Sequence, residues 1–161
     1  MSSKSKSTTM PARTISDYFD DLYSLSSHPP FGESSDIPRL GFGYLRDDKW
    51  LREFALKHHE VVPPKLVGKV FLDAEATKYI MVQLEQMMRM SIKIDETYYH
   101  VFYLGTNKTK EHLERAMNLE NVDQLKRLFD TEEDPKWMKI NHTIWSTFYP
   151  LNSLIQVYHW V

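Results

Sequence analysis

No cysteine occurs among the 161 residues of the chain. Disulfide bonds, zinc sites built on thiolates and thiol nucleophiles are therefore excluded. A chain without disulfides fits the reducing environment of the cytoplasm or the nucleus. The sequence predicts one of these two locations.

The chain also lacks a surplus of positive charge. It has 20 lysines and arginines against 22 aspartates and glutamates, for a formal net charge of −2. A dedicated nucleic-acid-binding protein normally carries a basic surplus that neutralises phosphates, so we predict no nucleic-acid partner.

The opening MSSKSKSTTMPART contains no apolar signal core, and no run approaches the roughly 18 apolar residues of a membrane span. We predict no membrane association.

The familiar local motifs of catalysis are missing as well. G-x-S-x-G, H-E-x-x-H and the EF-hand spacing do not occur. The triplet Gly41-Phe42-Gly43 lacks the third glycine and the lysine of a phosphate-binding loop. The sequence therefore predicts no cofactor and favours a non-catalytic function. An enzyme stays open as an alternative, because a pocket assembled from distant residues leaves no local motif.

The composition supports one folded unit preceded by a tail. Apolar residues make up 42% of the chain and aromatic residues 13%, which is enough for the core of a domain of this length. Residues 1–12 are mostly Ser, Thr and Lys, with almost nothing to bury, and this predicts a disordered tail. Residues 13–161 are predicted to form a single globular domain.

Periodicity and helix-capping residues predict a mainly helical α+β domain, with five to seven helices and one small β-sheet or hairpin. A methionine-rich stripe of the strongest helix is predicted to be its core face. The stripe consists of Ile80, Met81, Leu84, Met87 and Met88. The predicted helices include one within residues 14–28, then Asp47–His59, Asp73–Met90, Lys108–Asn118 and Val122–Asp130, the last with a capping box of Asn121 and Gln124. A long irregular connection is predicted between His28 and Tyr44, a strand at residues 65–72 and a hairpin at residues 91–104.

Two groups of residues raise the question of a metal site. His58, His59 and Glu60 end a predicted helix, but adjacent helical residues diverge by about 100°, so the two histidines cannot close on one ion. Histidines in a last helical turn interact favourably with the helix dipole, which explains them without a metal. Carboxylates at 17, 20 and 21 share one face of a predicted helix and have the chemistry for Mg²⁺, yet acidic residues near a helix N-terminus also complement the dipole. We predict no metal.

The leading functional hypothesis is a non-catalytic domain that binds another protein or itself. Its first candidate surface is the acidic helix containing Ile15, Phe19 and Leu22. These residues have the i, i+4, i+7 spacing of a helix that docks into a hydrophobic groove. The alternative is that the helix packs on its own domain, as most amphipathic helices do.

The second candidate surface is the aromatic region at the end of the sequence. Trp145, Tyr158 and Trp160 are of the residue types most often found as interface anchors. The carboxylate of Val161 must reach water, which makes complete burial of this end unfavourable. We predict a homo-oligomer or a docked protein partner at a face that includes Tyr158 and Trp160, although these side chains also suit the domain's own core.

The alternative hypothesis is a small enzyme or small-molecule-binding domain. Its candidate pocket is formed by Tyr98, His100 and Tyr103 in an aromatic strand. His100 is the candidate catalytic residue, because an imidazole among tyrosine hydroxyls can perform acid–base chemistry if its pKa lies near neutrality. The other interpretation of His100 is a hydrogen-bonded histidine of the sheet.

Overall fold

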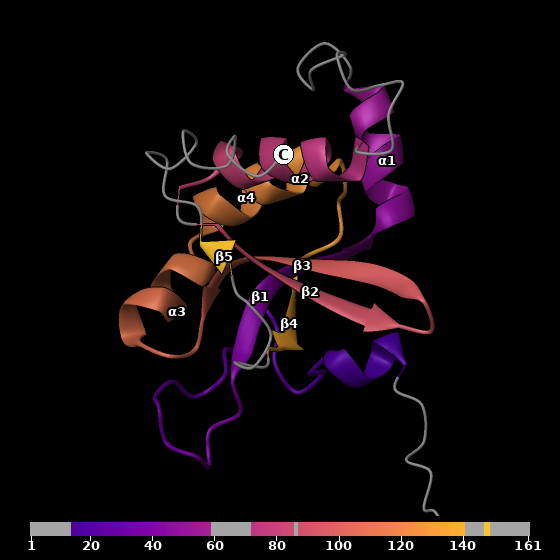
Figure 1. Cartoon of the computed structure of the whole chain (residues 1–161). Helices are drawn as coiled ribbons and strands as arrows, with labels where there is room; N and C mark the ends of the chain where they lie inside the picture. The colour runs from indigo at the N-terminus through magenta and orange to yellow at the C-terminus, as the bar shows by residue number, and fades with distance from the viewer. Residues whose placement is uncertain (1–13, 59–71, 86, 141–146, 149–161) are drawn as a thin grey trace, which may run out of the picture.

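A computed structural model describes residues 14–58, 72–85, 87–140 and 147–148 of the chain. Within these residues four α-helices accompany an antiparallel sheet with the strand order β4-β1-β3-β2-β5 (Figure 1). The helices are α1 Asp48–Lys57, α2 Leu72–Gln83, α3 Lys110–Ala116 and α4 Leu119–Phe129, and a 3₁₀ turn, η1, spans Ile15–Tyr18. The strands are β1 Leu40–Asp47, β2 Met88–Ile94, β3 Thr97–Thr106, β4 Lys136–Lys139 and β5 Thr147–Phe148. The prediction of a mainly helical domain with five to seven helices and a small sheet is therefore wrong.

The strand β1 replaces part of the predicted irregular connection. It pairs with β3 on one side and β4 on the other, so it is an inner strand of the sheet. A Cβ atom on Gly43 would lie 1.7 Å from the carbonyl oxygen of Phe102, and the β1–β3 register shifts between Phe42 and Gly43. Glycine at this position therefore marks a bulge and a close approach of two backbones within a strand, not a loop.

The strand β2 takes over the end of the predicted helix Asp73–Met90. Helix α2 ends at Gln83, and Met88 and Met90 pair with residues of β3. Ladder hydrogen bonds and burial against β3 outweigh the helix propensity of this methionine-rich stretch. The predicted stripe still supplies the core: four of its residues are buried, namely Ile80, Met81, Leu84 and Met87.

The predicted amphipathic helix near the N-terminus is reduced to η1. The backbone N–H of Thr14 donates to Asp17 Oδ2 at 2.7 Å, but Phe19 is already extended and bridges Met138 of β4. The N–H of Leu22 then donates to the side chain of Asp20 at 3.1 Å. Such local side-chain bonds compete with the helical backbone pattern, and the helix does not continue.

Other predicted elements are confirmed. The hairpin forms between β2 and β3, with positive φ at both Asp95 and Glu96, as a tight two-residue turn requires. Helix α1 begins where Asp47 accepts a hydrogen bond from the N–H of Trp50 at 2.8 Å. Helices α3 and α4 are also present, but Asn118 caps α4 in place of the predicted Asn121–Gln124 box. The predicted strand at residues 65–72 lies almost wholly outside the described residues.

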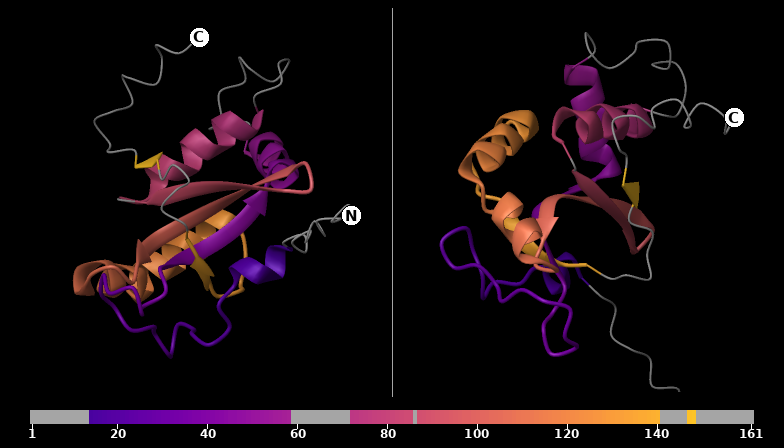
Figure 2. Two further views of the ribbon diagram at one scale, coloured as in Figure 1. Left: turned by 60° about the horizontal axis from the view of Figure 1, so that its bottom comes forward. Right: turned by 90° about the vertical axis from the view of Figure 1, so that its left-hand side faces the viewer.

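The two faces of the sheet carry two hydrophobic clusters. All four helices contribute to one cluster, which includes Phe102 and Trp137. The other cluster includes Val101 and Tyr103 of β3 and is covered in part by residues of η1. Figures 1 and 2 show η1, in indigo, on the opposite side of the sheet from α2. Successive side chains of β3 therefore point alternately toward the helices and toward η1.

Candidate functional site

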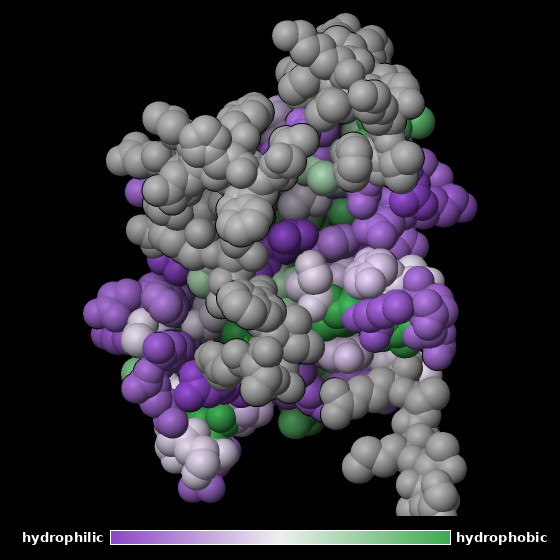
Figure 3. Space-filling model, in the orientation of Figure 1, coloured by the Kyte–Doolittle hydropathy of each residue, from purple (hydrophilic) through white to green (hydrophobic). Residues whose placement is uncertain are grey.

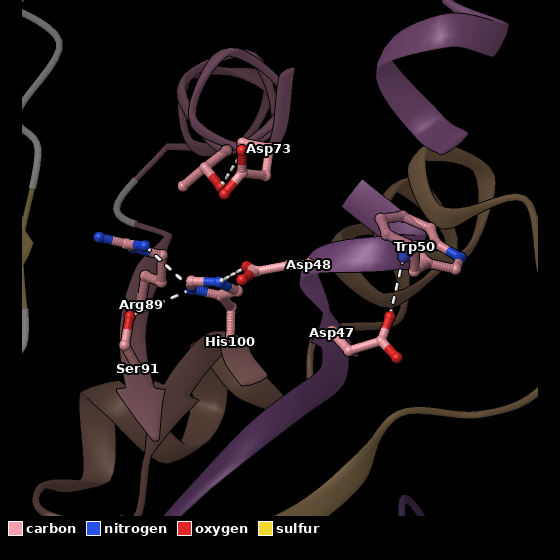
Figure 4. A network of polar contacts seen from close by, with 8 residues as sticks. Asp47, Asp48, Trp50, Asp73, Arg89, Ser91 and His100 are labelled. Carbon is pink, nitrogen blue, oxygen red and sulfur yellow. Dashed lines mark hydrogen bonds and ion pairs between the residues drawn. The ribbon is translucent and has the colours of Figure 1, made fainter. Parts of the chain in front are cut away.

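His100 lies at the centre of a polar network between the sheet and the first turn of α1 (Figure 4). Its side chain faces the helices, and the residue is 9% exposed. Its Nε2 is 2.7 Å from Oδ1 of Asp48, and its Nδ1 is 3.1 Å from both Ser91 Oγ and Arg89 Nη1. Asp48 thus meets the ring from one side, and Ser91 and Arg89 meet it from the other.

Strand register and helix capping explain this convergence. Ser91 is the cross-strand partner of His100 in the β2–β3 ladder, and Arg89 lies two residues before Ser91 on the same face of β2. Asp48 is the first residue of α1, directly after the capping residue Asp47. Sequence reasoning missed Asp48, Ser91 and Arg89 because only the β2–β3 pairing and the end of β1 bring them to His100.

The hydrogen bonds determine the tautomer of His100. A guanidinium only donates, so the contact with Arg89 requires Nδ1 to accept. The proton of the neutral ring then lies on Nε2, which donates to Asp48. Burial lowers the pKa of His100, the hydrogen bond to Asp48 opposes this, and the nearby Arg89 cation lowers it further. The imidazole is therefore neutral near pH 7.

Ser91, His100 and Asp48 are the residue types of a nucleophile, a general base and an orienting carboxylate. A base must keep a free lone pair to accept the proton of the serine hydroxyl. Here Arg89 donates to that lone pair and its charge disfavours protonation of the ring. The arrangement is better suited to tying the start of α1 to the β2–β3 hairpin than to proton transfer.

A second polar feature is a surface hollow between the segment that follows η1 and the segment that precedes β4. It has a volume of about 440 Å³, and we call it the acidic hollow. It is lined by Asp20, Asp21, Tyr23, Ser24, Leu25, Glu133, Asp134, Pro135 and Lys136. Two hydrogen bonds tie the segment after η1 to β4: the N–H of Asp20 donates to the carbonyl of Trp137 at 2.9 Å, and the indole N–H of Trp137 donates to the carbonyl of Ser24 at 3.4 Å.

The lining of the acidic hollow is strongly unbalanced in charge, with four carboxylates against one lysine. Asp134 forms an ion pair with Lys126 of α4 at 2.9 Å. For Asp20, Asp21 and Glu133, no ion pair occurs among the described residues. The hollow therefore presents negative charge that its own neighbours leave largely uncompensated.

Comparisons with known proteins identify no relative. No family model, curated protein or solved structure matches the chain. Function must be argued from this chain alone.

The residues of the predicted aromatic pocket do not gather in one place. Tyr98 is half exposed, with the ammonium of Lys93 5.3 Å from its ring centroid. Tyr103 is buried in the cluster on the η1 side of the sheet, where burial raises the pKa of its phenol to about 12. His100 faces the helices, so it and Tyr103 lie on opposite faces.

The predicted docking residues divide into three groups. Ile15 and Phe19 pack against the hydrophobic cluster of their own sheet. Leu22 is 79% exposed, beside the acidic hollow. The aromatic residues Trp145, Tyr158 and Trp160 lie outside the described residues, so self-association through them stays a prediction.

Of the possible metal ligands His58, His59 and Glu60, the structure describes only His58. His58 is the C-cap of α1, and its N–H donates to the carbonyl of Phe54 at 3.0 Å, while His59 and Glu60 lie outside the described residues. Within the described part of the chain, no three histidine or carboxylate side chains come close enough to hold a metal ion. In the same part, no helix is both long and apolar enough to cross a membrane.

Proposed function

We propose that this chain is a protein-interaction domain whose acidic hollow binds a basic, partly apolar segment of a partner protein. The observation that carries the proposal is the meeting of two acidic segments, more than a hundred residues apart in sequence, around one hollow. Asp20 and Asp21 come from one side, and Glu133 and Asp134 come from the other.

Charge complementarity determines the chemistry of the partner. Asp20, Asp21 and Glu133, which form no ion pair among the described residues, are matched by arginine or lysine side chains of a partner, which also accelerates encounter at low ionic strength. Arginine fits best, because its planar guanidinium donates to two carboxylates at once.

An apolar contact accompanies the charges. Tyr23, Leu25 and Pro135 contribute to the lining, and Leu22 stands exposed between Asp21 and Tyr23. In the coloured part of the face drawn in Figure 3, apolar patches are small and lie among hydrophilic residues. A short segment with basic and apolar residues in alternation meets both features of the hollow.

The test uses three blocked hexapeptides in which leucine alternates with arginine, lysine or glutamate, titrated into the full chain by calorimetry. We expect the arginine peptide to bind most tightly, the lysine peptide less tightly and the glutamate peptide not at all. Affinity for the arginine peptide should fall steeply with added salt, because exposed charges are screened within about 10 Å at 0.1 M.

Matched charge reversals locate the site. Asp21→Lys/Glu133→Lys should weaken binding of the arginine peptide at least about tenfold, which corresponds to roughly 1.4 kcal/mol. Glu111→Lys/Asp123→Lys changes the net charge equally on α3 and α4, outside the acidic hollow, and should leave most of the affinity. Equal loss in both double variants would show general electrostatic attraction and overturn the proposal. Binding of the glutamate peptide would do so as well.

A further inference from the structure

The ring of His100 has more partners at Nδ1 than a permanently neutral imidazole needs. Arg89 Nη1 and Ser91 Oγ both lie 3.1 Å from this nitrogen, while Asp48 Oδ1 lies 2.7 Å from Nε2. A neutral imidazole with its proton on Nε2 has one lone pair at Nδ1, and one donor satisfies it. The two neighbours of Nδ1 differ in chemistry, so each suits a different protonation state of the ring.

The hydrogen-bonding capacity of the two neighbours decides which state each one suits. A guanidinium only donates, so Arg89 can bond to Nδ1 only while this nitrogen carries no proton. A serine hydroxyl donates and accepts, so Ser91 can bond to Nδ1 in both states. When Nδ1 binds a proton, its N–H needs an acceptor, and Ser91 Oγ already lies within hydrogen-bond distance. The Asp48 carboxylate accepts from Nε2–H whether or not Nδ1 is protonated.

Electrostatics act in the same direction. Among the described residues, the charged groups that act on the ring are Asp48 of α1, Asp73 of α2 and Arg89 of β2 (Figure 4). A protonated ring and the Arg89 guanidinium would be two cations in direct contact, at a residue that is only 9% exposed. Repulsion between unit charges at such a distance is strong where water is largely excluded. A proton on Nδ1 therefore favours departure of the guanidinium, while Asp48 remains attracted to the ring.

The exchange requires no change in the sheet. Ser91 and His100 are directly paired in the β2–β3 ladder, so the short side chain of Ser91 stays beside the ring. Arg89 reaches the ring from two residues away and is only partly buried. Rotations about its own side-chain bonds are enough to move the guanidinium away from Nδ1.

We propose that His100 is an acid-operated switch in which Ser91 replaces Arg89 at Nδ1. A proton taken up from water turns Nδ1 from an acceptor into a donor, Ser91 accepts its hydrogen bond, and the Arg89 guanidinium leaves the ring. Asp48 keeps its bond to Nε2, so the start of α1 stays tied to the sheet in both states. The switch changes the position of one cation in the folded chain, and it is independent of the proposed peptide-binding function.

Nitrogen-15 NMR of the full chain tests the exchange directly. Long-range spectra between about pH 7.5 and about pH 4 report the protonation of each ring nitrogen of His100, assigned by the signals lost in His100→Gln. We expect Nε2 to be protonated throughout and Nδ1 to gain a proton in acid. The side-chain Nε–H signal of Arg89, assigned with Arg89→Met, should shift with the same midpoint. Backbone amide spectra recorded at each pH show whether the chain is folded.

Two substitutions should change the proton affinity of His100 in opposite directions. Arg89→Met removes the guanidinium and keeps an unbranched stem, so His100 should bind its proton about tenfold more tightly. Ser91→Ala removes the acceptor of Nδ1–H, so the proton should bind about tenfold more weakly. The exposed residues Arg52 and Ser34 provide matched controls, and Arg52→Met and Ser34→Ala should leave the affinity unchanged. A general loss of packing would not produce two effects of opposite sign.

Three results would overturn the proposal. The first is a His100 ring that stays neutral down to the pH at which the chain unfolds, because no exchange then occurs in the folded state. The second is a side-chain signal of Arg89 that does not follow the titration of His100. The third is a Ser91→Ala variant in which His100 binds its proton as tightly as in Ser34→Ala. None of these outcomes depends on whether the arginine peptide binds at the acidic hollow.

Discussion

The His100 network and the acidic hollow both collect charged side chains from distant parts of the sequence, but they treat those charges differently. Each nitrogen of the His100 ring has a partner within the chain, at 2.7 to 3.1 Å. In the acidic hollow, Asp20, Asp21 and Glu133 have no ion pair among the described residues. The first arrangement stabilises the fold, and the second leaves interactions available to another molecule.

The difference has a physical basis in burial. A buried polar group without a partner costs free energy, and both ring nitrogens of the buried His100 accordingly have partners within the chain. Exposed carboxylates remain solvated, and their mutual repulsion is small and screened by salt. Uncompensated charge can therefore persist only at the surface, where a partner with opposite charge can meet it.

The largest effect is expected for Trp137→Ala. Trp137 is fully buried, contacts the ring of Phe42 at 4.9 Å, and its backbone and indole hold the segment that lines the acidic hollow. Truncation should lower the free energy of unfolding by about 3–5 kcal/mol, as for other buried tryptophans. Chemical denaturation measures this. A loss below about 1 kcal/mol, as at surface positions, would mean that the hollow does not rest on the core.

A smaller effect distinguishes the two polar regions directly. Asp48→Ala removes the acceptor of the His100 Nε2–H and should cost about 1–3 kcal/mol in unfolding free energy. Asp48→Asn keeps an oxygen acceptor and should cost less. Asp21→Ala in the acidic hollow should stay within about 0.5 kcal/mol, as for most surface positions. Similar losses of unfolding free energy at Asp48 and Asp21 would show that the His100 network stabilises the fold no more than the acidic hollow does.

The smallest expected effect is the change in unfolding free energy with pH that protonation of His100 causes. Burial and Arg89 lower the pKa of His100 in the folded chain, against the hydrogen bond to Asp48 and the more distant charge of Asp73. The unfolded chain therefore binds more protons below about pH 6.5, the ordinary histidine value. The free energy of unfolding is fully maintained above that pH and falls as the pH drops toward the lowered pKa, by at most about 1.4 kcal/mol per pH unit.

The measurement compares urea unfolding of wild type and His100→Gln from about pH 7.5 to about pH 5, where the variant should show the shallower decline. Part of the decline should remain, because burial and the cations Arg115 and Lys108 also lower the pKa of His112. An identical decline in the two proteins would contradict the lowered pKa of His100 in the folded chain.

Local sequence signals predicted the elements that depend on local chemistry. Helix α1 follows from an aspartate cap and a core-facing stripe, and the β2–β3 hairpin follows from alternation ended by a polar turn at Asp95 and Glu96. The buried residues Ile80 and Leu84 were identified by spacing alone. These features need only a few neighbouring residues to be specified.

The elements that were predicted wrongly depend on partners far away in sequence. Gly41 and Gly43 suggested a loop, but pairing with β3 and β4 makes this stretch an inner strand. Met88 suggested the end of a helix, but the pairing with Tyr103 places it in β2. Backbone groups take whichever hydrogen-bonding partner the whole fold offers, and propensity is too weak to prevent this.

The sequence by itself determined the absence of thiol chemistry, the near balance of charge, and the residue types at the candidate sites. His100 was singled out from sequence, and Asp20–Asp21 and the acidic run at residues 132–134 were each visible there. Only the tertiary structure decided that Arg89 engages the lone pair of His100 and that the two acidic segments face one hollow. Strand pairing brings Arg89 to His100, and packing against Trp137 brings the two acidic segments together. Contacts between residues far apart in sequence leave no local pattern, so the sequence alone does not reveal them.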